Sequence, residues 1–75
     1  MSERRYLIVV EGDGVTNYSA YSPDIPGVVA TGATRDECER EMREAIGFHL
    51  EGLADDGDAA PEPHSSAGYA VVEVG

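Results

Sequence analysis

Aspartate and glutamate are the potentially catalytic side chains that are most numerous in this sequence. Fifteen of the 75 residues are Asp or Glu, and a two-metal nuclease needs several of them converging on ions about 3.5–4 Å apart. Glu11 and Asp13 would then have to meet Glu51 or Glu73 across the fold. Most of the carboxylates instead lie where an outer helix face or a loop is expected. We therefore expect a non-enzymatic protein with no catalytic or metal-binding residues, and keep a ribonuclease H-like metal nuclease only as a remaining alternative.

The histidines and the cysteine are poorly spaced for a metal site. His49 follows Cys38, the single cysteine, by eleven positions, which is about three helical turns and too far for both to bind one ion. The second histidine, His64, stands alone, and no Cys-x-x-Cys or His-x-x-x-His pair occurs. Cys38 fits an apolar stripe as a small hydrophobic residue. No disulfide within the chain is possible, and we expect no cofactor.

Charge is the outlying property of the chain. Fifteen acidic residues face five basic ones, which gives a formal net charge of -10. Such a chain repels a phosphate backbone, so we expect no autonomous nucleic-acid binding. It is drawn instead to a basic partner, although solubility alone also explains the charge.

The remaining bulk properties are those of one small globular domain. The chain is 41% hydrophobic and 27% charged, and we expect residues 1–75 to form a single domain. No apolar run approaches the roughly 20 residues of a membrane span, and the N-terminus does not resemble a signal peptide. We expect a cytoplasmic protein that makes no contact with a membrane.

Four stretches have the β-branched and aromatic residues typical of strands. They are residues 6–10, 15–21, 28–30 and 68–74. Asp13-Gly14 predicts a hairpin between the first two. Pro26 followed by Gly27 predicts a type II turn before the third. The first and last stretches carry apolar residues at both parities, which predicts burial on both faces.

A single long helix is expected over residues 35–53. Thr34 stands three residues before Glu37, the spacing of a capping box. Apolar residues then recur at a spacing of three and four along one core-facing stripe: Cys38, Met42, Ala45, Ile46, Leu50 and Leu53. Phe48 lies toward the edge of this stripe.

These elements assemble as an α+β fold in the order β-β-β-α-β. Two tight connections and a right-handed helical crossover give a mixed four-stranded sheet of order 3-2-1-4, with the helix on one face. One helix cannot cover both faces of such a sheet. The uncovered apolar face predicts a homo-oligomer, either a dimer or a tetramer.

An ordered set of short motifs resembles the HicB-like antitoxin family of type II toxin–antitoxin systems. The set begins with YSAYSPDIPG at residues 18–27 and ATGAT at 30–34, and continues with EAI at 44–46 and HLEGL at 49–53. Gly57, Pro61 and Pro63 complete it. The family-motif positions carried over to this sequence are Tyr18, Pro23, Asp24, Pro26, Gly27, Gly32, Thr34, Glu37, Ala45, Ile46 and Leu50.

The resemblance implies a partial, non-catalytic ribonuclease H-like fold. It also implies an antitoxin that occludes a small basic, RNA-cleaving toxin of the HicA type. Many family members continue into a DNA-binding domain, and this sequence resembles a short form without one. The alternative is a stand-alone oligomeric domain with a structural or small-ligand-binding role and no toxin partner.

Overall fold

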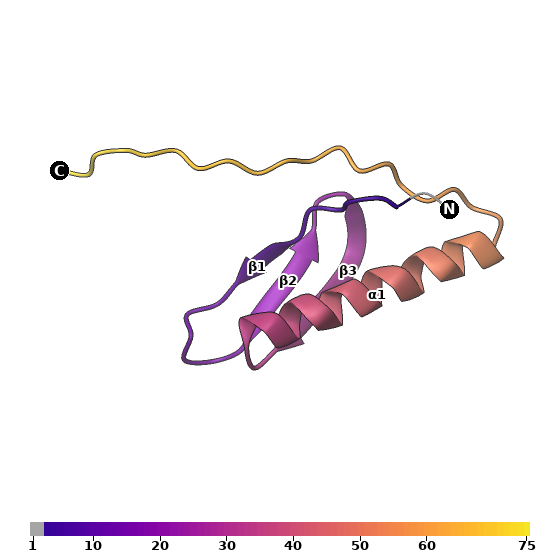
Figure 1. Ribbon diagram of the computed structural model, residues 1–75, viewed down its shortest axis with the longest axis horizontal. Helices are drawn as coiled ribbons and strands as arrows, with labels where there is room; N and C mark the ends of the chain where they lie inside the picture. Colours follow the sequence, from indigo (N-terminus) through magenta and orange to yellow (C-terminus); the bar gives the residue numbers. More distant parts are fainter. Residues whose placement is uncertain (1–2) are drawn as a thin grey trace.

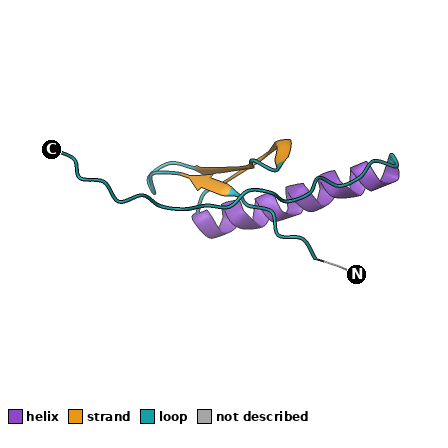
Figure 2. Cartoon of the chain, turned by 90° about the horizontal axis from the view of Figure 1, so that it is seen from above, coloured by secondary structure: helices purple, strands orange, loops and turns teal. Residues whose placement is uncertain are grey.

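A computed structural model describes residues 3–75 as a small antiparallel sheet, a helix and an extended tail (Figure 1). Strands β1 (Val9–Glu11), β2 (Tyr18–Ser22) and β3 (Ile25–Gly32) precede helix α1 (Arg35–Asp55). The sheet has the order β1-β2-β3, and both of its strand pairs are antiparallel. Figure 2 shows α1 lying against one face of the sheet. The predicted α+β class and the single covering helix are confirmed.

The first connection, residues 12–17, is longer than the tight hairpin predicted at residues 11–14. Asp13 Oδ1 accepts hydrogen bonds from the backbone N–H groups of Val15 (2.8 Å) and Thr16 (2.9 Å). This Asx-type turn occupies residues that were expected to open the return strand. Strand β2 therefore begins at Tyr18, and of the predicted strand at 6–10 only its last two residues, from Val9, belong to β1.

The second connection turns at a different place from the one predicted. The chain reverses at Pro23 and Asp24, and Ser22 pairs with Ile25 across the turn. Gly27 has a φ of 85°, which is the left-handed conformation expected for it. It lies within β3, where the pairing register shifts opposite Tyr21 and Ser22. The predicted type II turn at residues 25–27 is therefore wrong. Gly27 instead lies at the irregularity in the pairing of β2 with β3, where its positive φ is accommodated.

The helix agrees closely with the sequence pattern. Thr34 caps it, and its side-chain oxygen accepts a hydrogen bond from the Glu37 N–H at 3.1 Å. Cys38, Met42 and Ile46 are buried, as the apolar stripe predicts. These three side chains pack against Ala20, Ile25 and Val28 of the sheet to form the small core.

Gly32 allows β3 and α1 to approach each other closely. A Cβ atom at Gly32 would lie 2.5 Å from the backbone nitrogen of Cys38. Only glycine fits at this point without moving the strand away from the helix.

The outer face of the sheet is only partly apolar. Tyr21 and Val29 are exposed there, beside the polar Ser19 and Thr31. This face is therefore mixed, and the expected continuous apolar surface is absent from the part of the chain that the structure describes.

The predicted fourth strand is wrong. Residues 68–74 form no strand, and the tail runs past the sheet without pairing to it (Figure 1). Tyr69, Val71 and Val74 are more than nine-tenths exposed. The sheet therefore has the order 3-2-1 without a fourth member. An apolar, valine-rich composition indicates that a segment favours a strand, but it does not specify the edge that the segment pairs with.

Within residues 3–75, no helix is both long and apolar enough to cross a membrane.

Candidate functional site

Asp24 joins the corner between β2 and β3 to the distant tail. Its side chain is buried, and Oδ1 accepts a hydrogen bond from the Ser65 hydroxyl at 2.7 Å. His64 Nδ1 lies 3.1 Å from the same oxygen. The Ser65 hydroxyl lowers the pKa of the Asp24 carboxyl, the backbone amides of His64 and Ser65 act in the same direction, and burial opposes them. Asp24 is therefore held as a carboxylate that fastens the tail.

The Asp24, His64 and Ser65 side chains do not form a nucleophilic triad. In a triad, the serine hydroxyl passes its proton to histidine while the carboxylate orients the histidine's other nitrogen. Here the Ser65 hydroxyl and His64 Nδ1 both approach the same carboxylate oxygen. His64 Nδ1 also lies 3.2 Å from the Glu62 carbonyl oxygen. The Ser65 hydroxyl therefore donates to the Asp24 carboxylate and not to a histidine nitrogen, which is not the arrangement of a triad.

A second set of bonds holds the tail against the N-terminal segment. The Tyr6 hydroxyl donates to the Pro61 carbonyl oxygen at 2.7 Å. Arg4 donates to the carbonyl oxygens of Ala60 and Pro61, each at 3.2 Å, and pairs with Glu62 at 3.4 Å. Together with Asp24, these contacts hold the tail in place between residues 60 and 65.

Phe48 is the large hydrophobic side chain that α1 exposes to solvent. Phe48 is 81% exposed and lines a hollow of about 460 Å³ together with Val29, Gly52 and other residues. Glu44 and Glu51 lie four residues before it and three residues after it, which places them on the same helix face. We call this area, made of Val29, Glu44, Phe48, Glu51, Gly52 and Asp55, the Phe48 surface.

The Phe48 surface lies in the most acidic part of the chain. Six Asp or Glu residues and no Lys or Arg occur from residue 44 to residue 62. The three arginines of α1 all lie in its first half. Glu62 pairs with Arg4 but lies outside the Phe48 surface, which therefore combines an apolar centre with a negative rim.

The family-motif residues form a framework and do not gather into a single pocket. Tyr18 is half-buried and its ring lies against Gly12, while Thr34 and Glu37 cap α1. Ile46 belongs to the core, with Ala45 and Leu50 packed at its edge. Pro23, Pro26 and Gly27 are exposed at the corner. Of these residues, Gly27 and Ala45 reach the hollow beside Phe48.

The carboxylates do not assemble a metal centre. Among residues 3–75, no group of three or more His, Cys, Asp or Glu side chains is placed to hold an ion. Glu73 lies in the exposed tail, separate from the sheet that carries Glu11.

Sequence reasoning assigned Asp24 only a local role and missed its contact with Ser65. The two residues are 41 positions apart, and no periodicity links them. It also placed Phe48 at the edge of the apolar stripe without recognising it as the centre of an exposed surface. The run of acids around Phe48, with no basic residue among them, is the signal that could have shown this surface.

Comparison with known proteins gives three consistent matches. A family model described as the HicB_like antitoxin of bacterial toxin-antitoxin systems matches residues 6–72. The chain is 35% identical over 66 residues to an uncharacterized 14.9 kDa protein in the rep-hol intergenic region of Haemophilus phage HP1 (strain HP1c1), a match that covers 85% of this chain. The crystal structure of the Burkholderia pseudomallei antitoxin HicB superimposes with a TM-score of 0.73, at 36% identity over 81% of this chain.

The matches cover only part of each relative. They take in 47% of the phage protein and 46% of the Burkholderia chain. This chain therefore spans about half the length of the relatives that it matches.

Proposed function

The chain belongs to the HicB-like antitoxin family, and from this membership we propose that it binds and neutralises a small basic, RNA-cleaving toxin of the HicA type. The proposed action is occlusion without catalysis: the antitoxin covers the surface that the toxin uses on RNA. The partial ribonuclease H-like architecture implied by the resemblance would then serve as a binding scaffold.

The Phe48 surface is the observation that carries this proposal. Protein interfaces concentrate their binding energy in a few central side chains that a rim shields from water. Phe48 offers such a centre, because its ring is 81% exposed above a hollow that it shares with Val29. Glu44, Glu51 and Asp55 supply a polar rim.

Charge complementarity supports a basic partner. A toxin that acts on RNA needs a positive surface to hold phosphates, and this chain carries a formal charge of -10. Opposite charge speeds the encounter of two proteins and fixes their register. The negative rim around Phe48 would meet the positive surface of the toxin and exclude RNA from it.

We also propose that the chain works as a homo-oligomer. Only six apolar side chains are buried among the described residues, and a domain of this length gains stability from association. If no basic partner exists, a stand-alone oligomeric domain becomes the better description.

Co-expression with the small basic protein encoded beside this chain tests the toxin proposal. We expect a complex that suppresses ribonuclease activity, and activity that returns when the two proteins are separated. Phe48→Asp should weaken binding by about 2 kcal/mol or more, roughly 30-fold in Kd.

Val15→Asp is the matched control, because Val15 is equally exposed at 86% but lies in the loop after β1. It should leave the affinity unchanged. Equal losses in the two variants would remove the Phe48 surface from the proposal. The absence of any complex would refute the toxin-neutralising role itself.

A further inference from the structure

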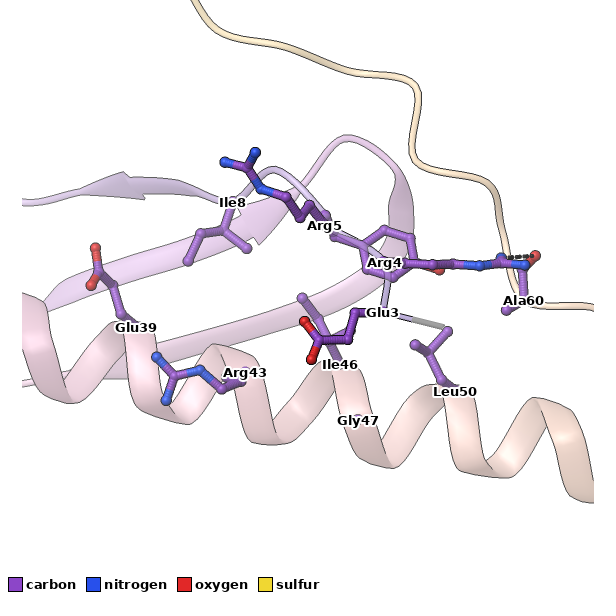
Figure 3. A pocket seen from close by; sticks show the side chains of 11 residues that line it. Glu3, Arg4, Arg5, Ile8, Glu39, Arg43, Ile46, Gly47, Leu50 and Ala60 are labelled. Atoms are coloured by element: carbon purple, nitrogen blue, oxygen red, sulfur yellow. Dashed lines mark hydrogen bonds between the residues drawn. The ribbon is translucent and has the colours of Figure 1, made fainter. Parts of the chain in front are cut away.

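A groove of about 800 Å³ lies between α1 and the segment that leads into β1. Ile8 lies on one side of it, and Ile46 and Leu50 of α1 lie on the other (Figure 3). Volumes of this size are typical of sites for small molecules, which are lined mainly by apolar side chains and a few polar groups. Among residues 3–75, none lines both this groove and the hollow beside Phe48. The groove is therefore a second, separate concave site.

The anchored tail forms one wall of the groove. Ala60 lines it, and Figure 3 shows the Arg4 side chain extended toward Ala60, whose carbonyl oxygen it bonds at 3.2 Å. The Tyr6 hydroxyl fixes the next residue of the tail through its bond of 2.7 Å to the Pro61 carbonyl oxygen. Because these bonds already hold the wall in place, a ligand would not bear the cost of ordering it.

The lining of the groove is positively charged, in contrast to the chain as a whole. It takes in three of the five basic residues of the chain and two of the fifteen acidic ones. These residues are Arg4, Arg5, Arg43, Glu3 and Glu39. The lining therefore carries one net positive charge, while the whole chain carries a formal charge of -10. An anion meets less repulsion here than over the acidic second half of α1.

Two of these arginines are available to an anion. Arg4 pairs with Glu62, whereas Arg5 and Arg43 form no ion pair with any residue from 3 to 75. They extend from opposite walls of the groove (Figure 3), and a guanidinium group binds a carboxylate by charge-assisted hydrogen bonds. Glu3 also lines the groove without an ion pair in this part of the chain, so a ligand with several negative charges is disfavoured.

We propose that this groove binds a small amphiphilic monocarboxylate, a ligand with one carboxylate and an apolar chain. The carboxylate would pair with Arg5 and Arg43, and its single charge matches the net charge of the lining. The apolar chain would cover the half-buried side chains of Ile8 and Leu50 and remove their remaining apolar surface from water. This binding goes beyond toxin neutralisation and does not depend on it.

Titration of the isotope-labelled full chain with octanoate, followed by the amide chemical shifts in NMR spectra, tests the site. Octanoate is kept below the concentration at which it forms micelles, at low ionic strength. We expect saturable shifts at residues 3–8 and 43–50, which include the lining of the groove. Octanol keeps the apolar chain without the carboxylate and should bind about tenfold more weakly. Octylammonium reverses the charge and should cause no shifts there. Equal affinity for octanoate and octanol, or no saturable shifts in the groove, would overturn the proposal.

Gly47→Trp tests whether the ligand occupies the groove. A Cβ at Gly47 meets nothing within 4 Å, so the added ring fills the groove without strain inside the chain and should abolish octanoate binding. Gly52→Trp is the matched control, because it changes another unobstructed helical glycine, one that faces the hollow beside Phe48. It should bind octanoate like the unmodified protein. Circular dichroism checks that both variants are folded, and equal affinities in the two would contradict the assignment.

Arg43→Gln tests the recognition of the carboxylate. It should weaken octanoate binding about tenfold, as expected for the loss of a charge-assisted bond, and leave octanol binding unchanged. Arg40→Gln removes the same charge from an exposed position of α1 that does not line the groove, and should change the octanoate affinity by less than about twofold. If both variants lost affinity equally, the overall charge and not the groove would govern binding, and the proposal would fail.

Light scattering separates a ligand site from a contact between copies of the chain. Gly47→Trp should leave the mass of the protein in solution unchanged. A smaller mass in this variant but not in Gly52→Trp would show that a second copy covers the groove, which would refute the ligand proposal. Phe48→Asp, outside the groove, should bind octanoate as tightly as the unmodified protein even where it loses the toxin. Loss of octanoate binding in Phe48→Asp would remove the ligand from this groove.

Discussion

Gly32 determines how closely β3 approaches α1. An added Cβ would lie 2.5 Å from the Cys38 nitrogen and 2.8 Å from its Cα, and neither backbone atom can rotate away. Gly32→Ala should therefore lower the free energy of unfolding by about 1–3 kcal/mol, the usual effect of overpacking. Urea denaturation followed by circular dichroism measures the change.

Gly47→Ala is the matched control for Gly32→Ala. It adds the same methyl group inside α1, where nothing lies within 4 Å of the new atom. The higher helix propensity of alanine should raise stability by up to about 1 kcal/mol. A loss of stability at position 47 equal to that at position 32 would contradict the assignment to close packing.

Asp24 makes the attachment of the tail depend on pH. Its pKa lies below the ordinary 3.8, so the unfolded chain binds a proton more readily than the folded chain in this range. The stabilisation is present above about pH 3.8 and is lost as the pH falls through the lower folded value. Hydrogen exchange of the amides at residues 60–66 should accelerate in acid beyond the intrinsic pH effect.

Asp13 also has a lowered pKa, because the backbone amides of Thr16 and Val15 bond to it. Asp24→Asn should remove the acid dependence at the tail and leave that of the loop after β1. Asp13→Asn should do the reverse. If Asp24→Asn left the acid response of the tail unchanged, another group would have to hold the tail.

At the scale of the elements, α1 depends on its N-terminal cap. Thr34 accepts a hydrogen bond from the Glu37 N–H at 3.1 Å, and this satisfies one of the amides that a helix start leaves free. Thr34→Ala should cost about 1 kcal/mol in the free energy of unfolding. Thr31→Ala, at an exposed position of β3, should change it by less than about 0.5 kcal/mol. Similar losses in the two variants would show that the cap contributes little.

The helix was predictable because its signals are local. The cap and the apolar spacing all lie within one segment, and the observed Arg35–Asp55 differs from the expected 35–53 by two residues at one end. The class of the fold and the antiparallel order of the first three strands followed from equally short-range patterns.

The errors concern strands, whose limits depend on partners elsewhere in the chain. The turn at Asp13 delays β2 to Tyr18, and residues 68–74 resemble a strand but form none with the part of the chain that the structure describes. The contact between Asp24 and Ser65 was equally unpredictable, since no rule of spacing joins a corner to a tail. The Phe48 surface was partly predictable. The sequence gives its residue types, but the exposure of the Phe48 ring is known only from the structure.

At the scale of the whole molecule, the Phe48 surface and the anchored tail use different regions. The Phe48 surface lies on the acidic second half of α1 and reaches Val29 on β3, whereas the tail is held against the N-terminal segment and Asp24. Among the described residues, none after Asp56 lines the hollow beside Phe48, so the tail leaves this surface open to a partner.

The net charge of -10 predicts that salt will slow binding of the proposed basic toxin. Attraction between opposite charges extends over about 30 Å at 0.01 M ionic strength and about 3 Å at 1 M. The association rate constant with the basic partner should fall about tenfold or more across this range, while the dissociation rate changes less. Stopped-flow mixing at several salt concentrations measures both. Glu44→Gln/Glu51→Gln should reduce the salt dependence more than Glu11→Gln/Glu73→Gln, which removes two exposed carboxylates outside the Phe48 surface. Equal reductions would mean that the overall charge, and no particular surface, guides the encounter.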